Sequence, residues 1–190
     1  MINKLQMLVP HRRLGYHEAL GLAEQQAQRL RQLIDNDYPA ITDAELRSIP
    51  GIVIEAVPNL KVSGATRQVG NLWIILINRD DMATRQRFTI GHELKHILDH
   101  QAHTAISTPQ PRWFTERICD YFAACLLMPR PWIKRAWTSG IQDLQQLAEA
   151  FDVSLTAAHI RLQQMGLIEA QQRCDTTSRD VVPLTAAVGT

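Results

Sequence analysis

RFTIGHELKHIL, residues 87–98, is the stretch of the sequence that decides the fold. It contains the pattern H-E-x-x-H, with His92 and His96 four residues apart. Four residues advance an α-helix by about 400°, so the two imidazoles lie on one face, one turn apart, and can close on a single metal ion. The spacing therefore predicts a metal-binding helix over residues 85–100. Its apolar positions are Phe88, Ile90, Leu94, Ile97 and Leu98.

Glu93 follows the first histidine, which places its carboxylate beside the metal rather than on it. A zinc ion lowers the pKa of a bound water to about 7, and a neighbouring carboxylate can take the proton as the water attacks a carbonyl. The same carboxylate can then protonate the leaving amine. We therefore predict a zinc (Zn²⁺) site with His92 and His96 as ligands and Glu93 as general base. Because the pattern also occurs by chance on surface helices, the surrounding sequence has to support it.

A catalytic zinc site needs a third protein ligand, and Glu116 is the candidate. It lies on a predicted helix over residues 113–128, and Asp120 follows it by four residues on the same face. A carboxylate at Asp120 can accept the free N–H of a ligand histidine and fix its tautomer. Taken alone, the two carboxylates also fit an ordinary solvated helix face.

Two further histidines are rival third ligands. His100 lies one turn beyond His96, but three ligands on one straight helix would spread over nearly three turns. His103 lies seven residues past His96, whereas the metzincin pattern places its third histidine six residues past the second. His103 and Tyr121 are candidates for stabilising the oxyanion, although a loop histidine and a packed aromatic are the plainer interpretations.

Upstream of the metal-binding helix the hydrophobic period changes to that of strands. Residues 52–57 are rich in β-branched side chains, and residues 62–69 form a weaker strand. Gly70 and Asn71 are a turn signal, and residues 72–77 then form the strongest strand. The continuous apolar content of that last strand predicts burial on both of its faces.

Helical periodicity accounts for most of the remaining sequence. Thr42 or Asp43 can cap one of these helices and open a capping box. The helix over residues 113–128 is expected to stop at Pro129 and Pro131. The other predicted helices cover residues 17–34, 42–48, 141–150 and 155–165, with a loop over residues 104–111.

The composition is that of an ordinary globular protein, with 45% hydrophobic and 21% charged residues. A formal net charge of +1 gives no overall field toward nucleic acid or an anionic membrane. No apolar run approaches the ~20 residues that span a bilayer, and residues 1–10 do not resemble a signal peptide, so we expect a cytoplasmic protein with no membrane partner.

The three cysteines are expected to be reduced thiols, partly buried. Cys119 and Cys125 lie six residues apart on one predicted helix, which separates their Cα atoms by about 9 Å, too far for a disulfide. With Cys174 they form no C-x-x-C pair, so a cysteine zinc site is not indicated.

Two stretches of the sequence resemble the ImmA/IrrE family of metallopeptidases. The first is residues 87–98. The second, residues 116–129, reads ERICDYFAACLLMP and is similar to that family's E-x-E-A-N-x-F-A-x-x-L-L-M-P stretch. Two long motifs in this order are far more specific than H-E-x-x-H alone. The resemblance extends over roughly residues 20–169 and includes Asn78, just ahead of the metal-binding helix.

The resemblance implies an α+β fold of the gluzincin-like type, in which a small mixed β-sheet packs against helices. It also implies a zinc ion bound by two histidines and a glutamate. Carried over by position, His92 and His96 are ligands, Glu93 is the base and Glu116 is the third ligand.

The chain departs from the family's pattern without losing a ligand. Asp120 stands where the family usually has Asn, and Ile118 and Cys119 stand where Glu and Ala are common. Lys95 replaces a common Gly. We expect Lys95 to put a flexible cation beside the site, where it would alter access of the substrate.

The resemblance further implies a regulatory protease. Such a protein is a zinc-dependent metallo-endopeptidase that cleaves a partner, either a helix-turn-helix transcriptional repressor or an antitoxin. We expect a metallopeptidase domain over residues 1–138, a C-terminal helix pair over residues 139–170 and a tail over residues 171–190. The sequence does not indicate an oligomeric state.

The C-terminal helix pair also resembles a helix-turn-helix, over residues 147–158. Residues 141–170 hold four carboxylates and a single cation, Arg161, which is a net charge of −3. A DNA reader should present cations to phosphates, so DNA binding by this chain on its own is not expected. We expect the pair to pack on the peptidase core or to contact the partner. The alternative function is a non-catalytic regulatory or binding module on a peptidase fold, associated with DNA.

Overall fold

The computed structural model describes residues 1–105 and 110–169, and of residues 102–105 only the backbone. The elements in these ranges confirm the α+β class. No helix in the described part of the chain is long and apolar enough to cross a bilayer. In chain order the elements are α1 (Ile2–Gln6), α2 (Tyr16–Leu33), α3 (Asp43–Arg47), β1 (Ile52–Val57), β2 (Gly64–Val69), β3 (Leu72–Asn78), α4 (Ala83–Ala105), α5 (Arg112–Leu127), α6 (Arg130–Thr138), α7 (Leu144–Ala150) and α8 (Leu155–Gln164).

The strands form a three-stranded mixed sheet in the order β1-β3-β2. The central strand β3 pairs parallel with β1 and antiparallel with β2. A tight turn at Gly70 joins β2 to β3, with a φ of 59° that glycine adopts without strain. Thr66 of β2 lies opposite the fully buried Ile75, so its side chain faces the helical core. Gly64 is two residues earlier, on the same face.

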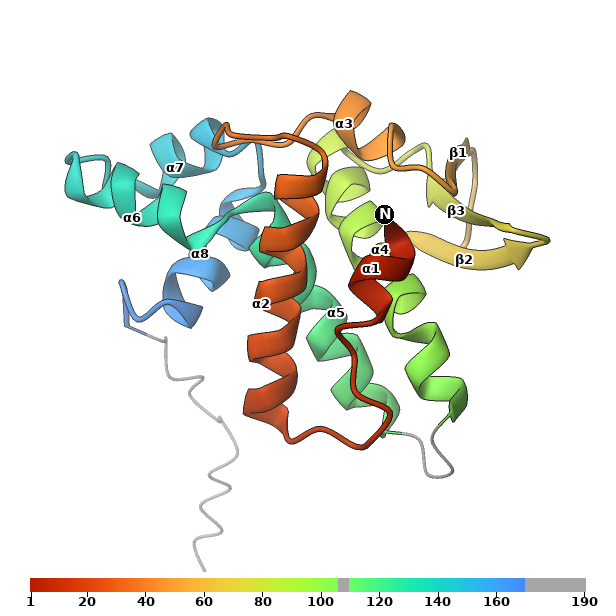
Figure 1. Cartoon of the computed structure of the whole chain (residues 1–190). Helices are drawn as coiled ribbons and strands as arrows, with labels where there is room; N and C mark the ends of the chain where they lie inside the picture. The colour runs from red at the N-terminus through yellow and green to blue at the C-terminus, as the bar shows by residue number, and fades with distance from the viewer. Residues whose placement is uncertain (106–109, 170–190) are drawn as a thin grey trace, which may run out of the picture.

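The prediction that β3 is buried on both faces is wrong. Ile75 and Ile77 are fully buried, but Leu72 is 48% exposed, and Val53 of the neighbouring strand is 38% exposed. α4 packs on β2 and β3 from one side, and the sheet forms one edge of the molecule in Figure 1. Side chains on the second face are therefore only half covered, even though they are apolar.

The helices α2, α4 and α5 form the central layer of the molecule. In Figure 1 they stand between the sheet on one side and α6, α7 and α8 on the other. α5 packs against both α2 and α4. Within residues 118–128 of α5 and its C-cap, every side chain except that of Asp120 is buried. The sequence of this segment is apolar around most of the helix because it has neighbours on most sides.

α4 and α5 pack most tightly at Gly91. A Cβ atom at this position would lie 3.1 Å from the Cβ and 3.2 Å from the Cα of Ala123, closer than ordinary contacts allow. A glycine opposite an alanine therefore lets the two helix backbones approach each other. This close approach sets one face of α4, with both histidines, against one face of α5.

The sequence did not predict two of the helices, α1 and α6. α6 begins at Arg130, between the two prolines expected to end the preceding helix. Pro131 lies in the first turn of α6, where a missing N–H leaves no hydrogen bond unmade. α1 has only five residues, too few for a helical period to be recognised. The capping box of α3 is confirmed, with Thr42 and Glu45 as its two members.

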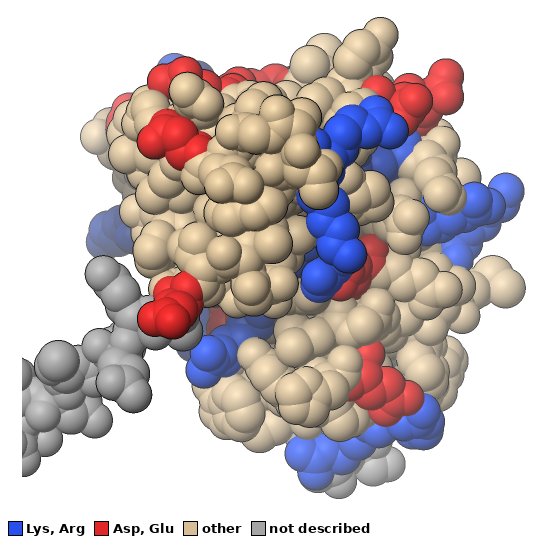
Figure 2. All heavy atoms as spheres, turned by 90° about the vertical axis from the view of Figure 1, so that its left-hand side faces the viewer, with Lys and Arg blue, Asp and Glu red and all other residues tan. Residues whose placement is uncertain are grey.

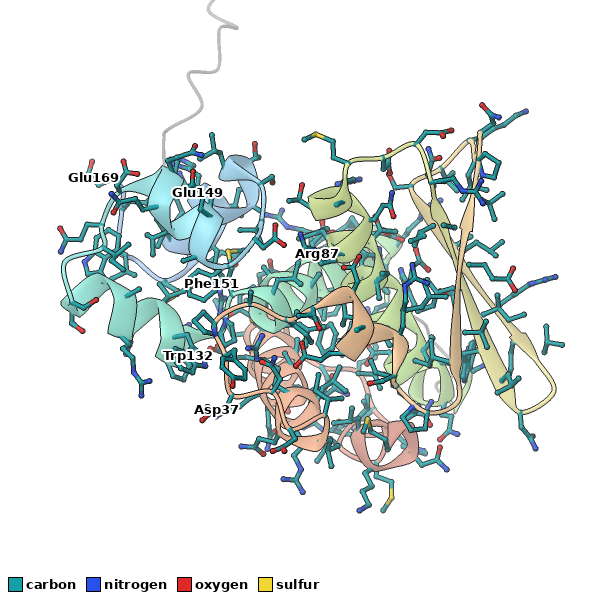
Figure 3. All side chains as sticks on the ribbon, turned by 90° about the horizontal axis from the view of Figure 1, so that it is seen from above. Asp37, Arg87, Trp132, Glu149, Phe151 and Glu169 are labelled. Atoms are coloured by element: carbon teal, nitrogen blue, oxygen red, sulfur yellow. The ribbon has the colours of Figure 1, made fainter. Side chains whose placement is uncertain are left out.

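α7 and α8 pack on the central layer through a continuous hydrophobic cluster that includes Phe151 and Leu162. Arg161, the cation of this region, is fully buried. Its Nε donates to the carbonyl oxygen of Met128 at 3.1 Å, and its guanidinium lies over the ring of Tyr121. Figure 3 shows Phe151 at the junction with the rest of the molecule. The guanidinium of Arg161 is thus enclosed in the protein and is not presented at the surface.

Among the residues that the structure describes, this side of the molecule carries no continuous basic face. Figure 2 views the side on which α6, α7 and α8 lie, and shows small separate groups of basic and acidic side chains among uncharged ones. Glu149 and Glu169 are exposed on the outer part of the helix pair (Figure 3).

The tight packing at Gly91 can be tested by comparing two alanine substitutions, one at Gly91 and one at Gly21, where a Cβ would meet no neighbouring atom. Gly21 lies inside α2, where an added Cβ would have no atom within 4 Å, so we expect Gly21→Ala to raise the free energy of unfolding by about 0.5–1 kcal/mol through helix propensity. Gly91→Ala gains the same propensity but forces α4 away from α5, and we expect a net loss of about 1–2 kcal/mol. Urea unfolding of both variants measures the difference, and equal stabilisation by both would contradict a tight crossing.

Candidate metal centre

The structure brings the predicted metal-binding side chains together across the crossing of α4 and α5. The Nε2 atoms of His92 and His96 lie 3.2 Å apart. On the facing helix, Glu116 places one carboxylate oxygen 3.2 Å from Nε2 of His92 and the other 4.0 Å from Nε2 of His96. Arg112, one turn earlier on α5, holds its Nε 3.6 Å from the same carboxylate.

These separations suit a tetrahedral zinc ion. With zinc–nitrogen bonds of about 2.0–2.1 Å, two ligand atoms at a tetrahedral angle lie roughly 3.3 Å apart. The histidine pair, and the pair formed by His92 and Glu116, both lie close to that separation. Two imidazoles and one carboxylate are also the donor set of a class of catalytic zinc sites, which leave a fourth position open. The residues present therefore fit a zinc ion.

Asp120 determines which nitrogen of His92 faces the other donors. Its Oδ1 lies 2.8 Å from Nδ1 of His92, so that Nδ1 donates and Nε2 keeps a lone pair toward Glu116. Burial lowers the pKa of His92, but the hydrogen bond and charge of Asp120 and the charges of Glu93 and Glu116 outweigh it, so the pKa is raised overall. Burial, followed by the charge on His92, lowers the pKa of His96. The pKa values of the two histidines are therefore shifted in opposite directions.

Glu93 lies beside the metal donors and is hydrogen-bonded to the sheet. Its Oε2 accepts a hydrogen bond of 2.6 Å from Oγ1 of Thr66 on β2. Gly64 makes this approach possible, because a Cβ there would lie 2.3 Å from Cγ2 of Thr89 and 3.3 Å from Cγ of Glu93. Thr66 was not predicted from the sequence. A glycine inside a predicted strand is a signal for close backbone approach, and it was the available pointer to this contact.

Cys119 is a further potential donor, which was not predicted from the sequence. Its Sγ lies with the ligand nitrogens of His92 and His96 in a group whose atoms are all within 4.8 Å of one another. Burial raises the pKa of the Cys119 thiol well above its ordinary value. Cys119 and Glu116 are therefore alternative third donors, and Glu116 places a carboxylate oxygen 3.2 Å from Nε2 of His92. Cys119 and Cys125 are both free, as predicted, while Cys174 lies outside the described residues.

The donor atoms open into a cleft of about 580 Å³ between β2, α4 and α5. Arg85 spans one side of it, with Nη2 lying 3.2 Å from Oγ of Ser63. The cleft is large enough for several residues of an extended chain. Its lining residues are Val62, Ser63, Gly64, Arg85, Phe88, Thr89, His92, Glu93, His96, Arg112, Glu116 and Asp120.

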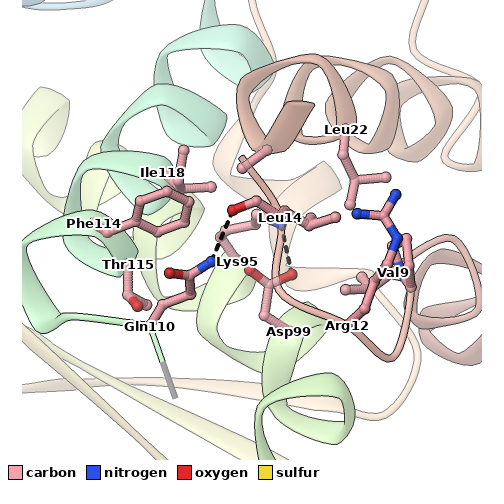
Figure 4. Close-up of a pocket in the computed structure, with 12 residues that line it drawn as sticks. Val9, Arg12, Leu14, Leu22, Lys95, Asp99, Gln110, Phe114, Thr115 and Ile118 are labelled. Carbon is pink, nitrogen blue, oxygen red and sulfur yellow. Dashed lines mark hydrogen bonds and ion pairs between the residues drawn. The ribbon is translucent and has the colours of Figure 1, made fainter. Parts of the chain in front are cut away.

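Lys95 does not lie beside the cleft, and the expectation that it is a flexible cation there is wrong. Its side chain points from the other side of α4 into the core and is 1% exposed. Nζ donates to Asp99 Oδ1 at 2.6 Å and to Gln26 Oε1 at 2.7 Å. Figure 4 shows this pair at a small cavity of about 40 Å³ near Leu14 and Phe114. Position 95 therefore contributes to an internal ion pair rather than to the cleft.

The other candidate residues lie elsewhere. The ring of His100 packs edge-on against Trp73, with the ring centroids 4.9 Å apart. The hydroxyl of Tyr121 donates to Glu24 at 3.1 Å, so it is engaged with α2 rather than with the metal donors. The side chain of His103 lies outside the described part of the chain.

Comparison with known proteins gives a consistent result. Residues 50–163 match a peptidase family described as the IrrE N-terminal-like domain. The radiation response metalloprotease IrrE of Deinococcus radiodurans is 30% identical over 128 residues, which cover 62% of this chain and 38% of that protein. A Mycobacterium tuberculosis transcriptional regulator shares the fold, with a TM-score of 0.59 and 17% identity over 85% of this chain and 51% of that chain. This chain thus spans about half or less of the length of these two relatives.

Metal binding should separate the two possible third donors. We expect Glu116→Gln to weaken zinc binding more than about 100-fold and Cys119→Ser to leave it nearly unchanged. Competition with a chromophoric chelator measures both affinities, and Glu149→Gln, on the far surface, is the control. Cobalt-loaded wild-type protein should lack the intense near-ultraviolet absorption of a cobalt–thiolate bond. That absorption, if present and lost in Cys119→Ser, would assign the sulfur and contradict Glu116.

The buried pair of Lys95 and Asp99 should be needed for stability rather than for chemistry. Asp99→Ala leaves a buried ammonium without its counter-ion, and we expect it to lower the free energy of unfolding by about 3–5 kcal/mol. The double variant Lys95→Met, Asp99→Leu removes both charges and should recover most of that loss. Thermal or urea unfolding provides the measurement. Equal stability of Asp99→Ala and wild type would show that Lys95 reaches solvent.

Proposed function

Because the chain belongs to the peptidase family of IrrE N-terminal-like domains, we propose that it is a zinc-dependent metallo-endopeptidase that cleaves a partner protein. The observation that carries the proposal is the convergence of His92, His96 and Glu116 from two helices, with the carboxylate of Glu93 held next to them by Thr66. Metallopeptidases require three such ligands, an open position and an adjacent base.

Each proposed residue has a distinct role in hydrolysis. His92, His96 and Glu116 would hold zinc, and Asp120 orients the imidazole of His92 through its Nδ1. Zinc bound there would polarise the scissile carbonyl and acidify water at its open position. Glu93 accepts the proton of the attacking water and later delivers it to the leaving amine. Thr66 holds the Glu93 side chain in place, because a single hydrogen bond of 2.6 Å fixes one carboxylate oxygen and leaves the other available.

The shape of the cleft supports a polypeptide substrate rather than a small molecule. β2 is an edge strand of the described sheet, and Gly64 at its start lines the cleft. An extended peptide can pair with such an edge through backbone hydrogen bonds, which do not depend on its sequence. Neighbouring side chains and pockets then select among peptides. This arrangement fits an endopeptidase.

We propose further that the partner is a transcriptional regulator, either a helix-turn-helix repressor or an antitoxin. The support is the resemblance of both motifs to the ImmA/IrrE family, whose IrrE N-terminal-like domain the chain matches. The alternative, a binding module associated with DNA, has less support. The cation of residues 141–170, Arg161, is buried, and the described part of the surrounding surface shows no continuous basic face (Figure 2).

The proposal is tested by replacing the base while keeping the metal ligands. We expect Glu93→Gln to retain one zinc ion per chain and to lower the rate of cleavage by roughly 100- to 10,000-fold, since a carboxamide cannot accept the proton. The assay incubates the zinc-loaded protein with the repressor or antitoxin encoded beside it and follows the products by mass spectrometry. Cleavage by Glu93→Gln at the wild-type rate would refute the mechanism. Unchanged function of His92→Ala in the cell would favour the binding module.

A further inference from the structure

A second, larger cavity continues from the metal cleft and has no role in the chemistry described so far. Its volume is about 730 Å³, and it lies between the first half of α4, the second half of α5, α8 and the start of α2. We refer to it as the apolar groove. Its lining residues are Tyr16, Leu20, Met82, Thr84, Arg85, Phe88, Arg117, Asp120, Tyr121, Ala124, Leu127, Val153, Ser154, Thr156, Ala157, Ile160 and Gln164.

The apolar groove and the metal cleft share part of their walls. Arg85, Phe88 and Asp120 line both. Met82 directly precedes α4 and lies ten residues before His92, which is about 15 Å along the helix axis. An extended chain covers that length in roughly four to five residues. A peptide whose scissile bond lies at the metal centre can therefore reach the groove within that length.

The groove offers exposed apolar side chains on its floor and rim. Ile160 is 45% exposed, Tyr16 is 36% exposed and Met82 is 78% exposed. Large apolar side chains exposed together, beside a concave surface, are characteristic of an interaction site. Contact with apolar atoms of a partner would remove this surface from water.

The charged side chains that line the groove are two arginines and one aspartate, and the aspartate is already hydrogen-bonded to His92. Arg85 and Arg117 are exposed and line the groove. Asp120 is its lining carboxylate among the described residues, and its Oδ1 is bonded to Nδ1 of His92. Two cations next to an apolar surface favour a ligand that combines apolar and acidic side chains.

We propose that the apolar groove is a specificity site for the protein substrate. It takes a segment of the substrate within about five residues of the scissile bond, with a large apolar side chain against Ile160 and an Asp or Glu against Arg85 or Arg117. This inference rests on the proposed peptidase function and names the chemistry of the substrate at that same site. The occupant is thus part of the partner chain.

The test is a binding experiment that does not depend on catalysis. Phage-displayed random dodecapeptides are selected on the zinc-loaded Glu93→Gln protein, and one selected peptide is then synthesised with a fluorophore. We expect the selected peptides to share a large apolar residue with Asp or Glu nearby. Adding Ile160→Gln should weaken binding of the synthetic peptide about tenfold. Adding Arg117→Gln should weaken it about threefold and reduce its salt dependence.

Leu155→Gln is the matched control, because Leu155 is on the same helix and 46% exposed but does not line the groove. It should change binding less than about twofold. Selected peptides without the shared pattern, or binding indifferent to Ile160→Gln, would overturn the proposal. So would peptides resembling residues 170–190 of this chain, or a dimer that Ile160→Gln dissociates, since these indicate a different occupant.

The outcomes separate this inference from the proposed function. Selective binding that depends on Ile160, with no cleavage of any bound peptide by the wild-type protein, would uphold the groove and refute the peptidase. Cleavage that depends on Glu93, at sites with no preference for apolar and acidic neighbours, would uphold the peptidase and refute the groove.

Discussion

The close approach of α4 and α5 at Gly91 and Ala123 is the constraint on which the rest of the structure depends. It sets the spacing between two helices, and with it the distance between the imidazoles of one and the carboxylates of the other. Donor atoms must meet within tenths of an ångström of their bonding separations to hold zinc. A larger residue at position 91 would move His92, one residue away, by about as much as the helices separate. The packing of two small residues therefore underlies the chemistry.

Much of the site could be predicted from the sequence because it depends on helical spacing. His92 and His96 had to share a helix face, and Glu116 and Asp120 had to share another. The sequence could not predict the contacts that depend on how separate helices and strands are placed relative to one another. The hydrogen bond from Thr66 to Glu93 depends on the register of two strands and on the position of the sheet over α4. The direction of the Lys95 side chain depends on which side of α4 faces the core. Because Lys95 is charged and precedes His96, the sequence suggested that it lies beside the metal site, but it points into the core.

The fold divides in the same way. The strands and the long helices follow from their hydrophobic periods, with boundaries displaced by one to three residues at most ends. α6 was missed because two closely spaced prolines indicate the end of a helix. A proline can also lie in the first turn of a new helix, as Pro131 does. Burial of the second face of β3 was expected from its apolar residues. The described sheet has only three strands, however, and α4 packs on one side of it.

Arg87 joins three separate parts of the chain. Its guanidinium pairs with Asp152, in the turn between α7 and α8, and its Nε lies 3.6 Å from Asp43 at the start of α3. Arg87 lies on the same helix as His92, so the C-terminal helix pair contacts the helix that carries the two histidines through this ion pair. Exchanging this pair for an unrelated segment would remove Asp152, the closer of the two carboxylates that pair with the buried Arg87, and would leave Asp43 as its remaining partner.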